Sequence, residues 1–440
     1  MTRPGAALCV VGGGWAGIAA AMQGVLDGWS VTLIEMAPRL GGRARHVDHP
    51  DLSIDNGQHI LIGAYTETLR LMRLAGADPV QLFERRPLEL IYPDGSGLRL
   101  PSGAPVVAFA RGILRAPGWA WSDRIALGRA ALSWFLSRFR CDPALTVADL
   151  ARRLSPRVRG ELIEPLCVAA LNTPAERASG GVFLRVIRDA LFSGPGSADL
   201  LLPRQSLSAL LPDPAARWLR AAGARVVTGR RVAQLQPDAA GWRVDDEHFD
   251  AVVLACSAQE AARLAQAAAP EWSMRTASFD YEPIVTVYLR SVGSRLDRPM
   301  TALRSTDRAP AQFVFDHGAL GGSPGLFAAV TSGAGEWVGA GLAAAGEATR
   351  QQLVAAFPAG TWAEPLTVLR TLSEKRATFR CTPGLVRPGT RVAPGLVAAG
   401  DYVDGPYPAT LEGAVRSGVA AVSTCDLRMQ MQFSSCKTAP

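Results

Sequence analysis

The chain has 440 residues, of which 48% are hydrophobic and 19% are charged, and its formal net charge at pH 7 is +7. This composition excludes an intrinsically disordered chain, and the length predicts more than one domain. The seven cysteines are scattered, form no Cys-x-x-Cys pair and are odd in number. They argue against a disulfide framework and fit a reducing cytoplasm, and we expect no bound metal.

A strand, a glycine turn, a helix and a second strand ending in Glu35 are predicted at the start of the chain. Gly12 permits the tight turn, Gly14 lets the backbone approach a pyrophosphate, and Gly17 lets the helix pack on the strand. The helix N-terminus offers free N–H groups to an anion, and Glu35 is spaced to accept the ribose hydroxyls of an adenosine. The pattern predicts dinucleotide binding by Gly12, Gly13, Gly14, Trp15, Ala16, Gly17 and Glu35.

A second glycine pair follows directly in Arg39-Leu40-Gly41-Gly42-Arg43. This stretch resembles the R-x-G-G-R extension of the FAD-containing amine oxidase and phytoene desaturase superfamily. In that superfamily the extension runs along the pyrophosphate and the ribityl chain. The resemblance implies that the dinucleotide is FAD and that Arg39, Gly42 and Arg43 contact it. An ordinary glycine turn with solvated arginines is the alternative interpretation.

The run from Asp55 to Tyr65 reads D-N-G-Q-H-x-L-x-G-A-Y. It resembles the same run in the hydroxysqualene dehydroxylase family, also described as the squalene-associated FAD-dependent desaturases of hopanoid pathways. The resemblance extends over most of the chain, from Val10 to about Gly418. In the superfamily this region passes beside the isoalloxazine ring, which implies flavin contacts for Gln58 and His59.

The resemblance implies reductive removal of the allylic hydroxyl of hydroxysqualene, a C30 isoprenoid, to give squalene. Such chemistry needs a protonated leaving group and a carbon held against N5 of reduced flavin. His59 and Asp55 are the titratable groups expected nearest the flavin, and Tyr407 approaches from the C-terminal part, so these three are the candidate catalytic residues. His59 equally fits a structural histidine, and Asp55 equally fits a cap of the following turn.

Residues 88–92 and 98–101 are predicted as a strand pair, and a largely helical stretch follows to about residue 200. Six arginines and one acid, Asp123, lie between residues 111 and 140. The aromatic residues interleaved with them are Trp119, Trp121, Trp134, Phe135 and Phe139. This pattern suits a membrane interface and equally suits a helix pair with a solvated basic face. Nucleic acid is not expected as a partner, because no known binding motif accompanies the charge.

Residues 207–222 are predicted as one helix, and residues 224–229, 232–235, 241–244 and 249–255 as strands. This block resembles the middle segment of the superfamily, where a valine placed like Val232 meets the adenine with its backbone. Cys256 closes an apolar strand and is interpreted as a core thiol. Residues 285–289 alternate in polarity and are predicted as a strand of a second sheet.

Near the C-terminus, residues 397–401 are predicted to form a buried strand ending in Gly400 and Asp401, and a helix is predicted to open at residues 409–418. These two parts resemble the superfamily's C-terminal flavin motif. The resemblance implies that Gly400 and Asp401 contact the ribityl or pyrophosphate region. Thr410 and Leu411 would present the helix N-terminus to the flavin O2 edge, where its dipole favours the negative charge of reduced flavin. Since no lysine or cysteine between the two parts is placed for covalent attachment, we expect non-covalent FAD.

The expected fold class is α/β, with a Rossmann-like FAD-binding domain interleaved with a mixed α+β substrate domain. Residues 1–85, 205–274 and 386–429 are assigned to the FAD-binding domain, and residues 86–204 and 275–385 to the substrate domain. Residues 430–440 are expected to form a flexible tail.

Two other enzymes on this scaffold remain open, namely a carotenoid-type desaturase and an amine oxidase. The latter predicts an aromatic cage and a flavin-facing lysine, whereas the chain has only Lys375 and Lys437. A non-enzymatic flavoprotein is the third alternative. The expected partners are the C30 isoprenoid, a membrane surface and the upstream synthases of the squalene pathway. The expected location is the cytoplasm, with a peripheral position on the inner face of the cytoplasmic membrane as an alternative.

Overall fold

A computed structural model describes residues 5–48 and 53–436 of the chain. One unit is built on a six-stranded sheet with the strand order β10-β2-β1-β14-β21-β20. Its strands are β10 (Arg225–Thr228), β2 (Ser30–Glu35), β1 (Ala7–Val11), β14 (Ala251–Leu254), β21 (Leu396–Ala398) and β20 (Arg391–Ala393). The first five pair in parallel, and β20 runs antiparallel to β21. Uninterrupted apolar runs such as β14 suit this buried parallel sheet.

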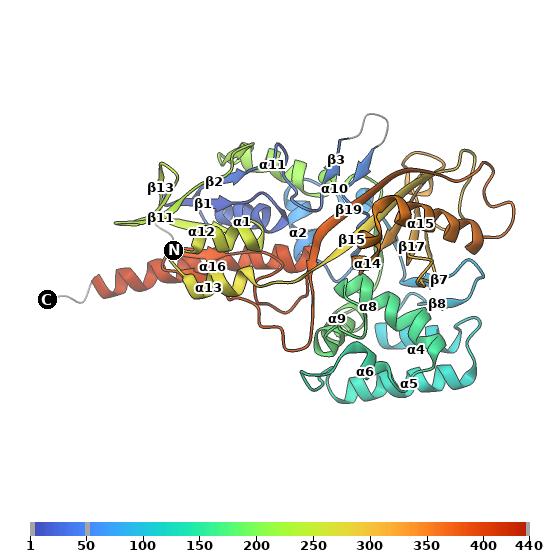
Figure 1. The fold of residues 1–440 in the computed structure, drawn as a ribbon. Coiled ribbons are helices and arrows are strands. Elements are labelled where there is room, and N and C mark those ends of the chain that lie inside the picture. The colour runs from blue at the N-terminus through green and yellow to red at the C-terminus, as the bar shows by residue number, and fades with distance from the viewer. Residues whose placement is uncertain (1–4, 49–52, 437–440) are drawn as a thin grey trace.

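Helices from opposite ends of the chain lie side by side in this unit (Figure 1), where α1 (Trp15–Leu26) packs along α16 (Leu411–Cys436). The remaining helices are α2 (Thr66–Leu74), α3 (Pro79–Leu82), α10 (Leu207–Leu210), α11 (Pro212–Ala221), α12 (Ala258–Ala265) and α13 (Pro270–Ala277). A small antiparallel sheet joins β11 (Leu235–Asp238), β12 (Gly241–Val244) and β13 (Glu247–Phe249).

The second unit is built on a five-stranded antiparallel sheet with the order β16-β17-β18-β15-β19. Its strands are β15 (Tyr281–Arg290), β16 (Met300–Ala302), β17 (Phe313–Asp316), β18 (Leu326–Thr331) and β19 (Thr367–Phe379). The helices η2 (Gly318–Leu320), α14 (Gly335–Ala340) and α15 (Leu342–Ala356) accompany it. The long strands β15 and β19 run from this sheet toward the first unit (Figure 1).

A helical lobe lies beside the second sheet (Figure 1). It contains α4 (Pro105–Leu114), α5 (Trp121–Leu136), α6 (Val147–Ala151), α7 (Pro156–Val158), the π-helix η1 (Arg159–Ile163), α8 (Glu164–Leu171) and α9 (Gly180–Phe192). Three short antiparallel groups link the parts. They are β3 (His46–Val47) with β4 (Ile54–Asp55), β9 (Leu200–Pro203) between β5 (Leu61–Ile62) and β6 (Phe83–Arg86), and β7 (Glu89–Ile91) with β8 (Gly97–Arg99).

The predicted α/β class and Rossmann-like parallel sheet are confirmed. The predicted helix over residues 207–222 is divided at Leu211, because Pro212 lacks an N–H and disfavours a helical residue before it. The strand predicted over residues 232–235 begins only at Leu235. The Asp245 carboxylate accepts hydrogen bonds from the N–H groups of Ala233 and Gln234, which therefore cannot pair with a neighbouring strand.

The C-terminal helix differs at both ends from its prediction. It begins at Leu411 instead of residue 409, because the hydroxyl of Thr410 accepts a hydrogen bond from the N–H of Gly413 and caps the first turn. It continues to Cys436, well into the segment expected to be a flexible tail, and residues 437–440 lie outside the described part of the chain.

Candidate functional site

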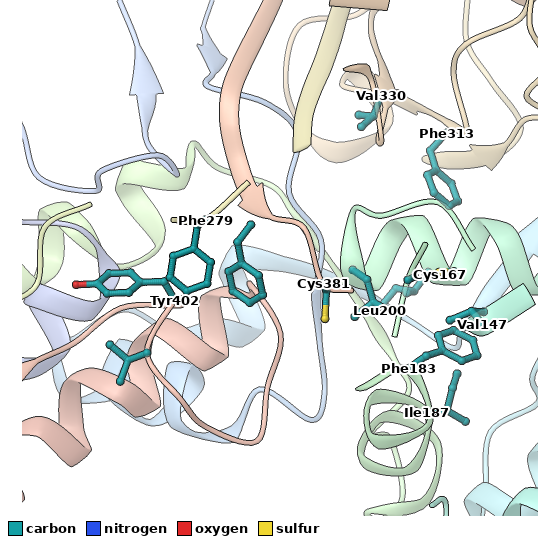
Figure 2. Close-up of a cluster of buried hydrophobic side chains, with 14 of the residues drawn as sticks. Val147, Cys167, Phe183, Ile187, Leu200, Phe279, Phe313, Val330, Cys381 and Tyr402 are labelled. Atoms are coloured by element: carbon teal, nitrogen blue, oxygen red, sulfur yellow. The ribbon is translucent and has the colours of Figure 1, made fainter. Parts of the chain in front are cut away.

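A cavity of about 710 Å³ is lined by residues of both units. Its polar end is formed by the glycine turn between β1 and α1 and by the start of α16, and its apolar end by α8, α9 and the second sheet. Figure 2 shows Tyr402 and Phe279 on the side toward α16, and Phe313, Val330 and Ile187 on the other side. The cavity therefore runs from a polar end to an apolar end.

The two glycine motifs lie backbone against backbone in the polar wall. Gly14 pairs with Gly41 in an isolated parallel bridge, and the N–H of Gly41 donates to the carbonyl of Gly13 at 2.8 Å. A Cβ built on Gly17 would lie 1.8 Å from the carbonyl oxygen of Gly12, so this glycine is required for the close packing of helix on turn. At Gly14 the nearest atom to such a Cβ is the Cα of Gly42 at 4.0 Å, so this backbone faces open cavity.

Glu35 and Val232 lie at the outer edge of the polar end, where an adenosine is expected. The Glu35 carboxylate is buried and accepts from the N–H groups of Gly13 at 2.6 Å and Ala37 at 2.7 Å. Each oxygen keeps a lone pair for a ribose hydroxyl. Val232 is buried in the cavity wall, and its carbonyl accepts from Arg263 at 2.8 Å, so its N–H is the backbone group left for a base.

Arg43 joins the N-terminal and C-terminal motifs across the cavity. Its guanidinium donates to Asp401 Oδ1 at 2.7 Å and to the carbonyl of Ala377 on β19 at 2.7 Å. The Asp401 carboxylate raises the pKa of Arg43, so the positive charge beside the glycine turn is maintained. A fixed guanidinium next to free backbone N–H groups favours an anionic ligand such as a pyrophosphate.

The N-terminus of α16 opens into the same cavity through Thr410 and Leu411. A Cβ on Gly400 would lie 2.5 Å from the ring of Tyr402, so this ring can pack here only beside glycine. Tyr402 lines the cavity, and its buried hydroxyl has no hydrogen-bond partner among the described residues. Such an orphaned group fits a polar ligand at this position.

The structure places most of the predicted cofactor contacts together. Those lining the cavity are Gly12, Gly14, Trp15, Ala16, Glu35, Gly42, Arg43, Gln58, His59, Val232, Gly400, Asp401, Thr410 and Leu411. Gly13 and Gly17 do not line the cavity and act through the shape of the turn. Arg39 is a correction, because it points outward, pairs with Asp48 at 3.0 Å and does not line the cavity.

Asp55 is the second correction, since it does not line the cavity. Its carboxylate accepts from the N–H of Leu207 at the start of α10, at 3.1 and 3.2 Å, and not within the Asn56-Gly57 turn. The hydroxyl of Tyr288 donates to the Asp55 carbonyl at 3.0 Å. Burial raises the pKa of the carboxyl to about 7. This geometry gives Asp55 a structural role and does not support proton transfer to a ligand in the cavity.

His59 and Tyr407 both line the cavity, and they differ in where each carries its proton. Burial lowers the pKa of His59, and its Nδ1 lies 3.1 Å from the carbonyl of Gly57. Because a carbonyl only accepts, Nδ1 carries the proton and Nε2 is an acceptor. Burial raises the pKa of Tyr407, so its phenol stays protonated.

Sequence reasoning missed Thr286, which lines the cavity from the middle of the second sheet. The backbone register aligns Phe313, Val330, Thr286 and Leu372 in one row, and all four line the cavity. The Thr286 side chain is 1% exposed, and its hydroxyl has no hydrogen-bond partner among the described residues. The signal was present in the alternation over residues 285–289, but its significance depends on the register of the neighbouring strands.

Cys256 lines the cavity without being a nucleophile, since burial raises the pKa of its thiol to about 12. Among the described residues, no group of three or more His, Cys, Asp or Glu side chains is placed to hold a metal ion.

A family model described as flavin containing amine oxidoreductase matches residues 15–425. The hydroxysqualene dehydroxylase of Rhodopseudomonas palustris is 29% identical over 442 residues, which cover 93% of this chain and 96% of the relative. The enzyme of the same name from Sinorhizobium fredii is 25% identical over 449 residues, with coverage of 93% and 95%.

Among solved structures, an oxidoreductase from Methanosarcina mazei superposes with a TM-score of 0.69 at 18% sequence identity. The match covers 95% of this chain and 99% of the other. At that identity the likeness establishes the fold. The family match identifies the cofactor as FAD. The free backbone of the glycine turns, Glu35, Arg43 and the start of α16 fit such a group at the polar end of the cavity.

The open backbone at Gly14 predicts that Gly14→Val removes FAD binding without unfolding the protein. The Cβ of a valine here would meet no protein atom closer than 4.0 Å, and the side chain would extend into the space expected for the pyrophosphate, so we expect FAD affinity to fall by roughly a hundredfold or more. Flavin fluorescence after denaturation and circular dichroism measure the two properties. Gly128→Ala on α5, where a Cβ also meets nothing within 4 Å, should retain FAD. A Gly14→Val protein that keeps stoichiometric FAD contradicts the assignment.

The raised pKa of Asp55 predicts that the free energy of unfolding depends on pH. A carboxyl whose pKa is higher in the folded state, here about 7 against 3.8, favours folding when protonated. Its contribution is present at low pH and is lost as pH rises toward 8, at about 1.4 kcal/mol per unit of pKa shift. Asp55→Asn should flatten the fall in unfolding free energy between pH 5 and 8 while keeping turnover. Unchanged stability with lost turnover is the contrary result and makes Asp55 catalytic.

Proposed function

The chain belongs to the flavin-containing amine oxidoreductase family, and on that premise we propose that this FAD-dependent oxidoreductase replaces the hydroxyl of hydroxysqualene with hydrogen to give squalene. Relatives named hydroxysqualene dehydroxylase match 93% of the chain and support this choice. The observation that carries the proposal is the buried hydroxyl of Thr286, a residue of the cavity wall, which has no hydrogen-bond partner among the described residues.

The apolar end suits a long isoprenoid. Its wall combines side chains from α8, α9, β9 and the second sheet, among them Leu166, Val186, Ile187, Leu200, Ile284 and Phe313. Such a lining excludes water and offers dispersion contacts along a hydrocarbon chain. It also protects a carbocation from solvent while the carbon–oxygen bond breaks.

Thr286 and His59 supply the two hydrogen-bonding partners that an alcohol needs. A Cβ built on Gly57 would lie 3.6 Å from Thr286 Oγ1 and 3.9 Å from His59 Cε1, so hydroxyl and imidazole flank the same backbone position. The Thr286 hydroxyl donates a hydrogen bond to the alcohol oxygen, and His59 Nε2 accepts a hydrogen bond from the alcohol O–H, which keeps its proton. An unpartnered buried hydroxyl costs about 1–3 kcal/mol, which a bound alcohol recovers.

In the proposed reaction the hydroxyl takes up one proton and leaves as water, and a hydride takes its place on carbon. Reduced FAD, when bound, supplies that hydride, and a two-electron reductant restores it. The protein holds the alcohol by Thr286 and His59, and the protonated phenol of Tyr407 remains our candidate for the proton donor. His59 is not assigned this step, because its lowered pKa leaves it neutral at pH 7.

An amine oxidase is disfavoured because no lysine of the described residues lines the cavity. Glu374 and Arg376 on β19 line it, and Lys375 between them therefore points to the other face of the strand. A carotenoid-type desaturase shares the need for an apolar cavity, but its hydrocarbon substrate leaves Thr286 without a partner.

A substrate panel separates these reactions. Purified holoenzyme with a chemical reductant should form squalene from hydroxysqualene, detected by gas chromatography with mass spectrometry. Phytoene with an oxidant, and a small primary amine in air, should remain unchanged. Desaturation of phytoene without squalene formation from hydroxysqualene contradicts the proposal.

The role of Thr286 predicts that Thr286→Val raises KM for hydroxysqualene by about tenfold or more, since a hydrogen bond in a buried site contributes about 1–3 kcal/mol. The melting temperature should stay the same or rise, because an unpartnered hydroxyl is removed. Thr286→Ser should restore KM.

Thr331→Val is the matched control for this variant. The Thr331 hydroxyl is also buried and unpartnered in the same sheet, but it does not line the cavity. It should affect stability alone. Equal KM values for both valine variants would show that Thr286 does not bind the substrate hydroxyl.

A further inference from the structure

The outer side of the helical lobe carries an exposed apolar surface formed by α4 and α5. On α5, Trp121 is 65% exposed, Ile125 59% and Leu136 72%, and their spacing puts them along one side of the helix. Leu132 and Phe135 are exposed on the same helix, and α4 adds Val106, Val107 and Leu114. Contiguous exposed apolar surface of this kind marks an interaction site.

The opposite side of α5 packs into the lobe. The helix is therefore firmly attached, and its apolar side chains are exposed although the helix itself is packed. Asp123 and Leu127 are buried. Trp119, which the sequence grouped with the surface aromatics, is a correction, because it is 4% exposed and its indole N–H donates to Glu161 at 2.9 Å. Trp134 packs partly on the core, so Trp121 is the indole of these three that is exposed.

Cations are interleaved with the apolar side chains. Arg111 and Arg129 are exposed on α4 and α5 at helical spacing from Leu114 and Ile125, and the Arg124 guanidinium lies 4.9 Å above the Trp121 ring. The one acid of this helix pair, Asp123, is buried and caps α5. A positive apolar surface complements anionic headgroups above acyl chains, whereas two copies of it would bring like charges together.

This surface adjoins the apolar end of the cavity. Helix α9 packs against α4 and contributes Val186 and Ile187 to the cavity wall. Figure 1 shows α5 along the outer edge of the lobe, and α8 nearer to the second sheet. No helix of the described residues is long and apolar enough to cross a membrane.

We propose that the α4–α5 surface docks on an anionic phospholipid surface without crossing it. The isoprenoid substrate then passes from the lipid into the adjoining apolar end of the cavity, a second step that rests on the proposed function. The arginines contact headgroup phosphates, and Trp121, Ile125 and Leu136 enter the interfacial region.

Vesicle sedimentation with holoenzyme tests the docking step. Binding to vesicles of phosphatidylglycerol and phosphatidylcholine should exceed binding to phosphatidylcholine alone and should weaken as salt increases. Ile125→Glu combined with Leu136→Glu should reduce binding by at least about tenfold, because two apolar contacts are lost and two negative charges face the membrane. Both residues are exposed, so the melting temperature should not change. Val80→Glu with Val354→Glu, exposed sites on α3 and α15, is the matched control and should bind as the parent does.

Different results would contradict the docking proposal in different ways. Equal binding to neutral and anionic vesicles, or full binding by the α4–α5 variant, overturns the docking proposal. Sedimentation velocity that shows a dimer broken by the same variant assigns the surface to a second copy instead.

Turnover measured in two forms tests the delivery step. The α4–α5 variant should lose activity on hydroxysqualene embedded in anionic vesicles and keep it on detergent-dispersed hydroxysqualene. Equal loss in both forms overturns delivery from the membrane. Absence of turnover by the parent in either form refutes the proposed function, while vesicle binding still decides the docking proposal.

Discussion

The close packing of α1 against α16 is the constraint on which the site depends, because it brings the two ends of the chain to one cavity. A Cβ on Gly418 would lie 2.1 Å from the carbonyl oxygen of Ala16, so any other residue there would push α16 outward. With glycine, the N-termini of both helices open into the same cavity, and Arg43 reaches Asp401 at 2.7 Å. Two helix dipoles, free N–H groups and one fixed guanidinium then converge where FAD carries its negative charge.

The division of the cavity into a polar and an apolar end follows from which unit supplies each wall. The parallel sheet ends in glycine turns that expose backbone, whereas the antiparallel sheet and α9 expose alternate side chains of apolar strands and helices. Thr286 is the polar member of a row of apolar residues across that sheet. A single alcohol on a long hydrocarbon matches this arrangement, and the proposed docking of the α4–α5 surface would bring such a molecule from lipid.

Local patterns in the sequence predicted most of the residues that line the polar end of the cavity, but not the surroundings of the candidate catalytic residues. The roles of Gly12, Gly14 and Gly17 depend on a turn that the chain makes within a few residues, and the motif predicts it. The positions of Asp55, Arg39 and Trp119 were predicted wrongly because each depends on a partner that the local pattern does not reveal. Asp55 accepts from the N–H of Leu207, Arg39 pairs with Asp48, and Trp119 donates to Glu161. Thr286 was missed for the same reason, since only the register with the neighbouring strands places this residue in the row that lines the cavity.

Anaerobic single turnover tests most directly the claim that one cavity holds FAD and an isoprenoid alcohol in reacting contact. Holoenzyme reduced in the absence of oxygen and mixed with hydroxysqualene should show reoxidation of the flavin spectrum and formation of squalene at the same rate, with one squalene formed per flavin. Flavin that stays reduced while hydroxysqualene is recovered unchanged would contradict the account.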